Sequence, residues 1–560
     1  MKGSAHADRF VIDNMPPREQ WPAFIFKTPN LQFPERLNAT VLLLDQAVAE
    51  GRGDHPAMIG RCEHWTYAQL QAQVNRLARL LTEDMGLVPG KRVLLRGANS
   101  PWLGAAWLAV WKAGGIAVGT GPLLRAKELR QILTLGKISH ALCEASLAGE
   151  LEHARAECPA LQQVALYGTD EWATRLAAKS DQFQALDTAA DDPALIAYTS
   201  GTTGVPKGCI HSHRDLIAMC EVFPRHCLKP DENDVFIGTP PLAFTFGLGG
   251  VLCFPLHYRA TSVLLENLPP AELLAAMEKY RVTICFTSPT AYRQMTPVVR
   301  NHDLSALKKC VSAGEPLPMA SRDAWRAATG IQIHDGVGGT EMIHIYIASD
   351  PGSYRPGAIG KPLPGYRAQL VDQNMKPVPP GETGWLALQG PTGCRYLADA
   401  RQTDYVRNGW NITGDTYHCD ADGYYYFHAR ADDIIVTSGY NVASPEVESV
   451  LLEHPAVAEC GVVGIPDIER GQLLKAFVVL NPGHIADDAV IRELQTFVKN
   501  NAAPYKYPRQ IEFVEKLPRT EVGKLQRFKL KGVAEARDGS TPGCTRSDDF
   551  DSSRNTLAQP

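Results

Sequence analysis

The chain has 560 residues, of which 44% are hydrophobic and 21% are charged, and its formal net charge at pH 7 is −5. A chain of this length exceeds what one hydrophobic core supports, so we expect at least two domains. The slightly negative balance lacks the basic excess that holds a phosphate backbone, and we therefore expect no nucleic acid as a partner.

Cysteine usage and hydropathy indicate the compartment. The 13 cysteines include no Cys-x-x-Cys pair, which favours reduced thiols and a cytoplasmic location. Met1–Phe10 has no apolar segment typical of a secretion signal. The most apolar stretch, Trp102–Trp111, is followed by Lys112 and by Gly114–Gly115, so it predicts a buried helix and no membrane span.

Strand-like and helix-like segments alternate through most of the chain. Arg92–Leu95 predicts a strand, and Ser100 then offers an N-cap to a helix that has Pro101 at its first position. Further strands are predicted at Ala194–Tyr198, Ser262–Leu265 and Val282–Thr287, with a helix at Pro270–Lys279. This alternation predicts an α/β fold on a parallel sheet, with ligands bound at the ends of the strands.

The pattern changes after Arg430. Ser444–Glu446 begins a helix, and strands are predicted at Val457–Val463 and Ala476–Leu480, followed by apolar residues at helical spacing from Val490 to Val498. We predict an N-terminal domain over residues 1–431 and a small α+β domain over residues 432–534. The polar segment 535–560 has little to bury and is predicted to be disordered.

Residues 198–208 read Tyr-Thr-Ser-Gly-Thr-Thr-Gly-Val-Pro-Lys-Gly, directly after a predicted strand. Glycines let the backbone approach a ligand, hydroxyls donate hydrogen bonds, and a lysine adds a compact cation, so the run predicts a phosphate-binding loop. It does not fit the Walker A pattern. A Ser/Thr/Gly-rich surface turn is the alternative. The candidate phosphate contacts are Thr199, Ser200, Gly201, Thr202, Thr203, Gly204 and Lys207.

This loop resembles the signature of the adenylate-forming superfamily, which comprises acyl- and aryl-CoA ligases, luciferases and peptide-synthetase adenylation domains. Further matching motifs follow in the same order between residues 40 and 530. The resemblance implies a large multi-sheet N-terminal adenylate-forming domain and a small, mobile α+β C-terminal domain. It also implies ATP, magnesium and coenzyme A as cofactors.

Several residues match the family's nucleotide and thiol sites. An ionised Asp415 would accept both ribose hydroxyls, since a carboxylate takes two donors at once. A solvated loop aspartate is the alternative for an isolated Gly-Asp pair. The remaining contacts that the resemblance implies are Gly314, Glu315 and Pro316 at the adenine, Asp335 and Gly336 in a second glycine-rich motif, Arg430 at the ribose, and Ser438, Gly439 and Tyr440 along the thiol tunnel.

The resemblance also assigns catalytic roles. Thr340 would donate to a phosphate, and Glu341 would hold magnesium beside it. Lys524, at the end of Pro518–Lys524, would neutralise the attacking carboxylate and the α-phosphate. Asp432 would be the hinge about which the small domain rotates between two half-reactions. In the first, a carboxylate attacks the α-phosphate of ATP to give an acyl-adenylate, and in the second a thiol displaces AMP.

His211-Ser212-His213 could be mistaken for a metal site. No cysteine or acidic partner lies at ligand spacing, so we interpret both histidines as supporting residues and predict no zinc.

The predicted acid pocket suits a small flat acid, although core packing would give a similar set of residues. Its members are Phe244, Thr245, Phe246, Gly247, Val337, Gly338, Gly339, Ile343 and His344. Val337 stands where most members of the family carry tyrosine, and benzoate-type ligases also have an aliphatic residue there. The segment Asp13–Trp21, in contrast, is more similar to 2-aminobenzoate–CoA ligases. We therefore expect 2-aminobenzoate as the substrate, with benzoate as the alternative and Thr245 or His344 as candidates to accept from an ortho amino group.

The sequence is compatible with other functions as well. The chain could be another small-acid CoA ligase, or it could load a carrier protein in trans. It could also be a luciferase-like oxygenase or an inactive nucleotide-binding regulator, although Lys524, Glu341 and Asp415 are all present. The partners expected are a small aromatic acid, ATP and coenzyme A, and the sequence is compatible with a monomer or a homodimer.

Overall fold

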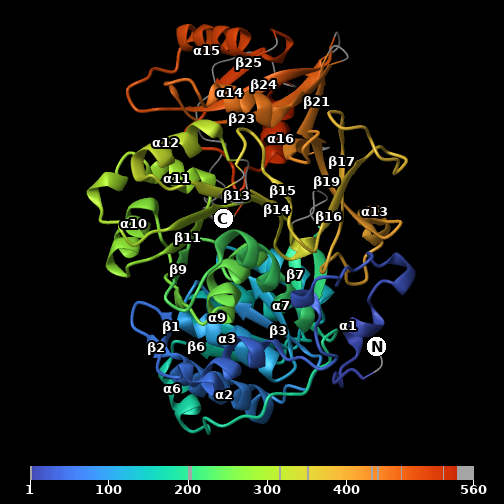
Figure 1. Cartoon of the computed structure of the whole chain (residues 1–560), viewed down its shortest axis with the longest axis vertical. Helices are drawn as coiled ribbons and strands as arrows, with labels where there is room; N and C mark the ends of the chain where they lie inside the picture. Colours follow the sequence, from blue (N-terminus) through green and yellow to red (C-terminus); the bar gives the residue numbers. More distant parts are fainter. Residues whose placement is uncertain are drawn as a thin grey trace, which may run out of the picture. The chain divides into compact units, whose positions relative to one another are not determined.

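A computed structural model describes residues 3–199, 205–314, 317–349, 352, 354–430, 433–437, 440–467, 470–502, 504–520 and 523–538. The chain forms two compact units, Met1–Phe427 with Glu521–Gly523, and His428–Thr520 with Lys524–Pro560. The fold is α/β, with a large N-terminal unit and a smaller C-terminal one (Figure 1). Residues 431 and 432, where the domain boundary is predicted, lie outside the described ranges.

A six-stranded sheet of the large unit has the order β6-β5-β3-β4-β7-β8, and all neighbours are parallel except β7 and β8. The predicted strands at Arg92 and Ala194 are confirmed. In chain order the strands are β3 (Arg92–Arg96), β4 (Ile116–Thr120), β5 (His140–Glu144), β6 (Gln163–Tyr167), β7 (Pro193–Thr199) and β8 (Lys207–Ser212).

A nine-stranded sheet has the order β15-β14-β13-β12-β11-β9-β10-β1-β2. Its central strands are parallel, whereas β2, β14 and β15 pair antiparallel at the two edges. The prediction of parallel pairing therefore holds for the centre of each large sheet. The strands are β1 (Pro56–Ile59), β2 (His64–Thr66), β9 (Val235–Gly238), β10 (Thr261–Val263), β11 (Ile284–Thr287), β12 (Lys309–Ser312), β13 (Ile333–Gly338), β14 (Ile345–Ala348) and β15 (Lys361–Pro362).

Helices form layers around these sheets. The helix α3 (Pro101–Lys112) begins as predicted, because the Ser100 hydroxyl accepts from the N–H of Leu103 and Pro101 occupies the first position. Trp107 and Trp111 of this helix are completely buried in a core that strands of both large sheets share, so the apolar stretch is an interior helix. The same core takes in α2 (Tyr67–Arg79), α6 (Asp170–Ala177), α7 (His213–Phe223) and α9 (Phe254–His257).

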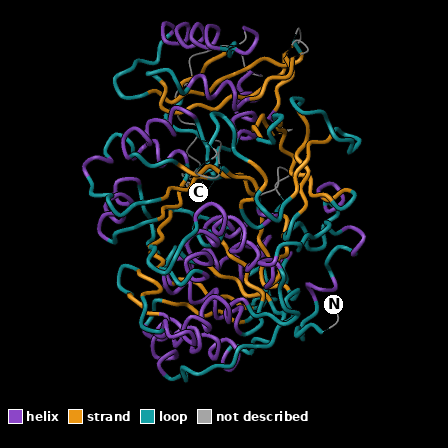
Figure 2. Tube along the Cα trace, viewed as in Figure 1, coloured by secondary structure: helices purple, strands orange, loops and turns teal. Residues whose placement is uncertain are grey.

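The outer faces of the two sheets are covered separately. A second core joins the six-stranded sheet to α4 (Ala126–Leu135) and α5 (Ala148–Arg155). A third joins the nine-stranded sheet to α10 (Pro270–Lys279), α11 (Pro289–Met295) and α12 (Met319–Thr329), which gather along one side of it in Figure 1. The helix α10 has the predicted bounds. Figure 2 shows the resulting alternation of strands and helices in this unit.

A smaller five-stranded sheet follows in the chain, and its last strand continues past Phe427, where the large unit ends. Its strands are β16 (Arg367–Val371), β17 (Thr383–Gln389), β18 (Val406–Arg407), β19 (Trp410–Cys419) and β20 (Tyr425–Arg430). Short helices complete the connections: α1 (Phe10–Asp13), α8 (Thr245–Leu248) and α13 (Gln402–Tyr405).

The small unit is a five-stranded sheet with helices on both faces. Its strands are β21 (Ile434–Thr437), β22 (Tyr440–Ala443), β23 (Val457–Asp467), β24 (Gly471–Leu480) and β25 (Gln510–Phe513). One core includes α14 (Ser444–Leu451) and α15 (Asp488–Asn501), and another includes α16 (Arg527–Asp538). Residues 535–538 of the predicted disordered segment are helical, and residues 539–560 lie outside the described residues. No helix in the described part of the chain has the length and apolar character needed to cross a membrane.

Candidate active site

The predicted phosphate loop connects two antiparallel strands at the edge of the six-stranded sheet. Thr199 ends β7 and Lys207 begins β8, and the two residues are directly paired across the strands. The Thr199 hydroxyl is buried and has no hydrogen-bond partner among the residues that the structure describes. The loop residues Ser200, Gly201, Thr202, Thr203 and Gly204 lie outside the described residues. The described ends of the loop therefore bring an unsatisfied hydroxyl and a lysine close together.

Glu341 lies beside this loop, in the 3₁₀ turn Thr340–Met342 that follows β13. Its Oε1 accepts a hydrogen bond from the Tyr396 hydroxyl at 2.6 Å and lies 3.8 Å from the Lys207 ammonium. The Glu341 side chain is 14% exposed. A partly exposed carboxylate with an oxygen left over after this bond is the kind of ligand that magnesium takes, so Glu341 fits the predicted metal role.

A row of buried polar side chains contacts the backbone of the Thr340–Glu341 turn. The ring Nε2 of His211 is 2.7 Å from the carbonyl oxygen of Thr340 and donates to it when it carries the proton. The other ring nitrogen is 3.9 Å from Asp215, which forms an ion pair with Arg395. All three side chains are completely inaccessible to solvent. His211 is thus a supporting residue, as predicted, whereas His213 accepts from the N–H of Ala39 through Nδ1 and supports a different part of the chain.

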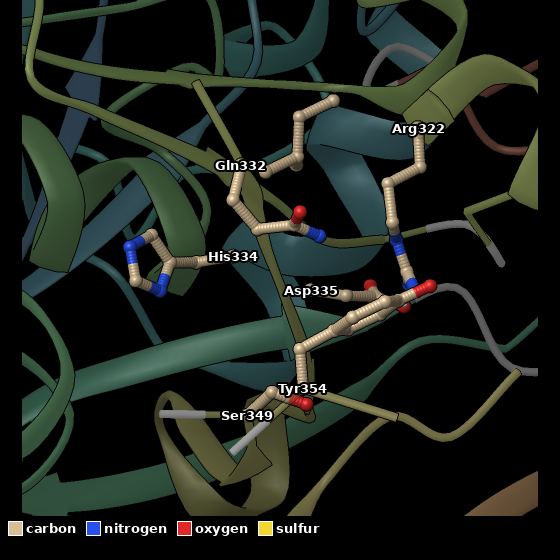
Figure 3. Close-up of a pocket in the computed structure, with 7 residues that line it drawn as sticks. Arg322, Gln332, His334, Asp335, Ser349 and Tyr354 are labelled. Atoms are coloured by element: carbon tan, nitrogen blue, oxygen red, sulfur yellow. Dashed lines mark hydrogen bonds and ion pairs between the residues drawn. The ribbon is translucent and has the colours of Figure 1, made fainter. Parts of the chain in front are cut away.

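Asp335 lies in β13 and is one of the residues that line a small cavity, which Figure 3 shows in close-up. Its Oδ2 is 3.3 Å from Nη2 of the buried Arg322, and the ring of Tyr354 lies over the guanidinium of Arg322 at 4.7 Å. Burial raises the pKa of Asp335 to about 6, against the opposing effect of Arg322. The Nε and Nη1 atoms of Arg322 are buried and find no hydrogen-bond partner in the described ranges of the chain. The cavity thus combines an acceptor of unusually high pKa with unsatisfied donors.

The remaining nucleotide candidates are placed as follows. Gly314 follows β12 with a φ of 91°, a conformation that favours glycine, and Asp415 lies half-buried in β19 after Gly414, which has a φ of 77°. Gly336 lies in β13. Arg430 and Tyr440 lie in β20 and β22. The predictions for Glu315, Pro316, Asp432, Ser438 and Gly439 fall outside the described residues.

His344 is the centre of an aromatic cluster that includes the predicted acid-pocket residue Phe246. The ring centroid of His344 lies 4.6 Å from Phe254, 5.7 Å from Phe246 and 5.9 Å from Phe223. Burial lowers the pKa of His344 to about 3, so the imidazole is neutral at pH 7. Both ring nitrogens are buried, and the described part of the chain offers neither of them a hydrogen bond of good geometry, although the backbone of Phe246 opposes the lowering of the pKa. A neutral ring with an unsatisfied nitrogen can receive a donor from a ligand.

The backbone around His344 is tightly constrained. Ile343 is completely buried and has a φ of 66°, which is strained for a β-branched residue and costs about 1–3 kcal/mol. A Cβ added at Gly338 would lie 2.8 Å from the backbone carbonyl of His344, and one added at Gly247 would lie 2.3 Å from the carbonyl oxygen of Pro241. Strain that persists in a packed site indicates a functional constraint on the adjacent side chain. The other predicted pocket residues lie nearby in sequence: Phe244 before α8, Thr245 in α8, and Val337 and Gly339 on either side of Gly338.

In the small unit, Lys524 closes a turn with Thr520. The Lys524 N–H donates to the Thr520 hydroxyl at 3.1 Å, and the Thr520 N–H donates to the Lys524 carbonyl at 2.8 Å. The Lys524 residue is exposed to solvent.

Sequence reasoning did not single out Tyr396, Arg395, Asp215 or Arg322. The Tyr396–Glu341 and Arg395–Asp215 contacts join residues 55 and 180 positions apart. Neither pair has a local spacing signal, and the pairing of residues 395–397 with β8 helps to bring them together.

Known proteins resemble the chain over nearly its whole length. Residues 45–396 match the family described as AMP-binding enzyme, and residues 446–524 match the C-terminal domain of AMP-binding enzymes. The benzoate–CoA ligase of Thauera aromatica is 37% identical, and the match covers 90% of this chain and 98% of that protein. A crystal structure of the anthranilate CoA ligase AuaEII in complex with anthranoyl-AMP has a TM-score of 0.88 at 34% identity, covering 92% of this chain and 100% of that one. A benzoate CoA ligase from Burkholderia xenovorans LB400 has a TM-score of 0.81 at 32% identity, covering 88% and 100%.

Proposed function

Since the chain belongs to the family of AMP-binding enzymes and is an AMP-forming acid–CoA ligase, we propose that it activates a small aromatic acid and prefers 2-aminobenzoate. The relatives named for benzoate and anthranilate support an aromatic substrate. The observation that favours 2-aminobenzoate is the buried, neutral His344 with its unsatisfied ring nitrogens. Benzoate is the second candidate, because the 37% identical relative is a benzoate–CoA ligase.

The first half-reaction joins the acid to AMP. We propose that Lys207, Thr199 and Thr340 hold the phosphates, and that Glu341 binds magnesium, which would offset phosphate charge when bound. Asp335, Gly336 and Gly314, with Glu315 and Pro316, would contact the adenine, and Asp415 and Arg430 would hold the ribose. The acid carboxylate then attacks the α-phosphorus and pyrophosphate leaves. Positioning and charge neutralisation do this work without a covalent enzyme intermediate.

The second half-reaction transfers the acyl group to coenzyme A. In this proposal the small unit presents Lys524 for adenylation, then rotates about Asp432 so that Ser438, Gly439 and Tyr440 line the thiol path. The thiolate attacks the carbonyl carbon of the acyl-adenylate, the thioester forms, and AMP leaves. We also propose a cytoplasmic location, which the free thiols of all described cysteines support.

Acid-dependent exchange of radiolabelled pyrophosphate into ATP tests the substrate assignment. The panel holds 2-aminobenzoate, benzoate, 4-hydroxybenzoate, a cinnamate, acetate and a medium-chain fatty acid. We expect the highest kcat/KM with 2-aminobenzoate and the next with benzoate. Exchange with acetate or the fatty acid alone would overturn the aromatic assignment.

The role of His344 predicts a change in selectivity. His344→Leu removes the ring nitrogens, so the ratio of kcat/KM for 2-aminobenzoate over benzoate should fall about 2- to 10-fold, the usual contribution of one neutral hydrogen bond. His344→Gln, which retains an acceptor, should preserve part of the preference. An unchanged ratio in His344→Leu would show that the amino group is recognised elsewhere.

The raised pKa of Asp335 predicts a pH-dependent affinity for ATP. Its carboxylate, proposed to accept from the adenine amino group, loses its charge as the pH falls through about 6. Charged acceptors bond about twice as strongly as neutral ones, so the KM for ATP should rise about fivefold between pH 7 and pH 5. Asp335→Asn should remove this component while leaving the titration of ATP itself. Equal pH profiles for both proteins would contradict the role, and thermal unfolding would report any loss of folding from the unpaired Arg322.

A further inference from the structure

Tyr396 contacts Glu341, and the two half-reactions described above assign no role to this tyrosine. Its hydroxyl donates to Oε1 of Glu341 at 2.6 Å, and the side chain is 1% exposed. Burial and the nearby charge of Glu341 raise the pKa of Tyr396 well above its ordinary value, so the phenol remains protonated and can only donate to the carboxylate.

The same ring also lies next to Lys207. The Lys207 ammonium lies 4.8 Å from the ring centroid of Tyr396, and 3.8 Å from the oxygen that the Tyr396 hydroxyl already occupies. The hydroxyl of Tyr396 thus contacts Glu341, and its ring contacts Lys207. Lys207 interacts with the ring face and with the carboxylate at the outer limit of an ion pair, and so it keeps donors for a phosphate.

The position of Tyr396 is fixed by the backbone. The Leu397 N–H donates to the Gly208 carbonyl at 2.8 Å, and the Ile210 N–H donates to the Arg395 carbonyl at 2.8 Å. The Tyr396 N–H donates to the side chain of Gln402 at 2.9 Å. Residues 395–397 therefore pair with β8 through an isolated antiparallel bridge between Tyr396 and Cys209, and β8 itself begins at Lys207. Because these bonds fix the backbone of Tyr396, its hydroxyl can hold the Glu341 carboxylate in one orientation.

The second carboxylate oxygen of Glu341 remains for a ligand. Among the described residues, no hydrogen bond to Oε2 accompanies the one that Oε1 accepts from Tyr396. Oε2 lies near Gly339, where an added Cβ would be in ordinary van der Waals contact with it at 3.6 Å. Because Oε1 is held by Tyr396, rotation of the carboxylate is restricted. Partners that orient a metal-binding carboxylate typically contribute 10- to 100-fold to metal affinity or activity.

We propose that Tyr396 is a positioning residue that orients the Glu341 carboxylate for the divalent cation of Mg·ATP and keeps Lys207 available to the phosphates. This inference rests on the proposed function, because it assumes that Glu341 meets the metal. Tyr396 touches neither the acid nor the nucleotide in this scheme, and it acts only through Glu341 and Lys207.

Tyr396→Phe is the direct test, because it removes the hydroxyl and retains the ring against Lys207. In pyrophosphate exchange, the free magnesium giving half-maximal rate should rise about 10-fold or more, with kcat at saturating magnesium close to that of the wild type. Binding of Mn²⁺ in the presence of ATP, followed by electron paramagnetic resonance, should weaken by the same factor without any turnover. Tyr405→Phe is the matched control, since its ring packs 5.9 Å from that of Tyr396 and no hydrogen bond joins it to Glu341 among the described residues.

A double-mutant cycle distinguishes a specific effect on Glu341 from a general folding defect. Glu341→Asp withdraws the carboxylate from the hydroxyl while keeping its charge, and Tyr396→Phe should then add nothing to the shift in metal dependence. Additive effects, an unchanged magnesium dependence in Tyr396→Phe, or an equal shift in Tyr405→Phe would each overturn the inference alone. A wild-type protein without any acid-dependent exchange would overturn the proposed function as well.

Discussion

Lys524→Ala is expected to lower the rate of adenylation about 10²–10³-fold, because one well-aimed donor contributes roughly that factor to a charged transition state. The proposal assigns Lys524 to the first half-reaction only. The thioesterification of chemically prepared aroyl-adenylate by coenzyme A should therefore stay within about threefold of the wild-type rate, well inside the effect expected for a lost transition-state donor. Single-turnover assays of the two steps measure this difference.

The substitution of Lys524 by alanine preserves the backbone hydrogen bonds of the turn. The hydrogen bonds that close the turn between Thr520 and Lys524 use backbone groups of residue 524, which alanine retains. Lys516→Ala, at another exposed lysine of the small unit, controls for a general loss of positive charge. Equal losses in both half-reactions would remove the main support for a rotation of the small unit between steps.

Glu341→Gln should reduce acid-dependent pyrophosphate exchange at least about 100-fold. Residues that merely orient a metal ligand contribute up to that factor, so loss of the ligand's charge should cost no less. Gln retains an oxygen that can accept from Tyr396, and so the turn should stay folded while the metal site loses its anion. Exchange rates measured across a magnesium titration, alongside thermal unfolding, separate these effects.

Glu382→Gln makes the same chemical change at an exposed carboxylate of the large unit and should leave exchange unchanged. Restoration of wild-type exchange in Glu341→Gln at millimolar magnesium would mean only weakened binding. Wild-type exchange at every magnesium concentration would contradict the metal role of Glu341.

Local signals predicted those parts of the fold that depend on local physics. The N-cap Ser100, the first-turn Pro101 and the bounds of α10 follow from capping and periodicity, and each is confirmed. Strand ends were less predictable: β10 ends at Val263 and β11 begins at Ile284, although Leu264 and Thr283 still donate backbone hydrogen bonds to Ile59 and Val235. The antiparallel edges β8 and β14 could not be predicted from alternation alone, since alternation does not give the direction of a strand.

The candidate site divides in the same way. Glycines, hydroxyls, Glu341 and Lys207 belong to continuous motifs and could be selected from the sequence. The groups that orient them could not, because Tyr396 and Arg395 contact partners 55 and 180 positions away in the sequence. His344 was selected as a pocket residue, but its neutral state results from burial among Phe223, Phe246 and Phe254, which lie far apart in sequence.

The products of a complete reaction show whether the protein forms an aroyl-CoA with release of AMP. Purified protein would be incubated with ATP, magnesium, coenzyme A and 2-aminobenzoate or benzoate, and AMP and thioester would be quantified by chromatography and mass spectrometry. We predict AMP and aroyl-CoA in equal amounts, with faster formation from 2-aminobenzoate. AMP release without thioester, or no AMP release with either acid, would contradict the account.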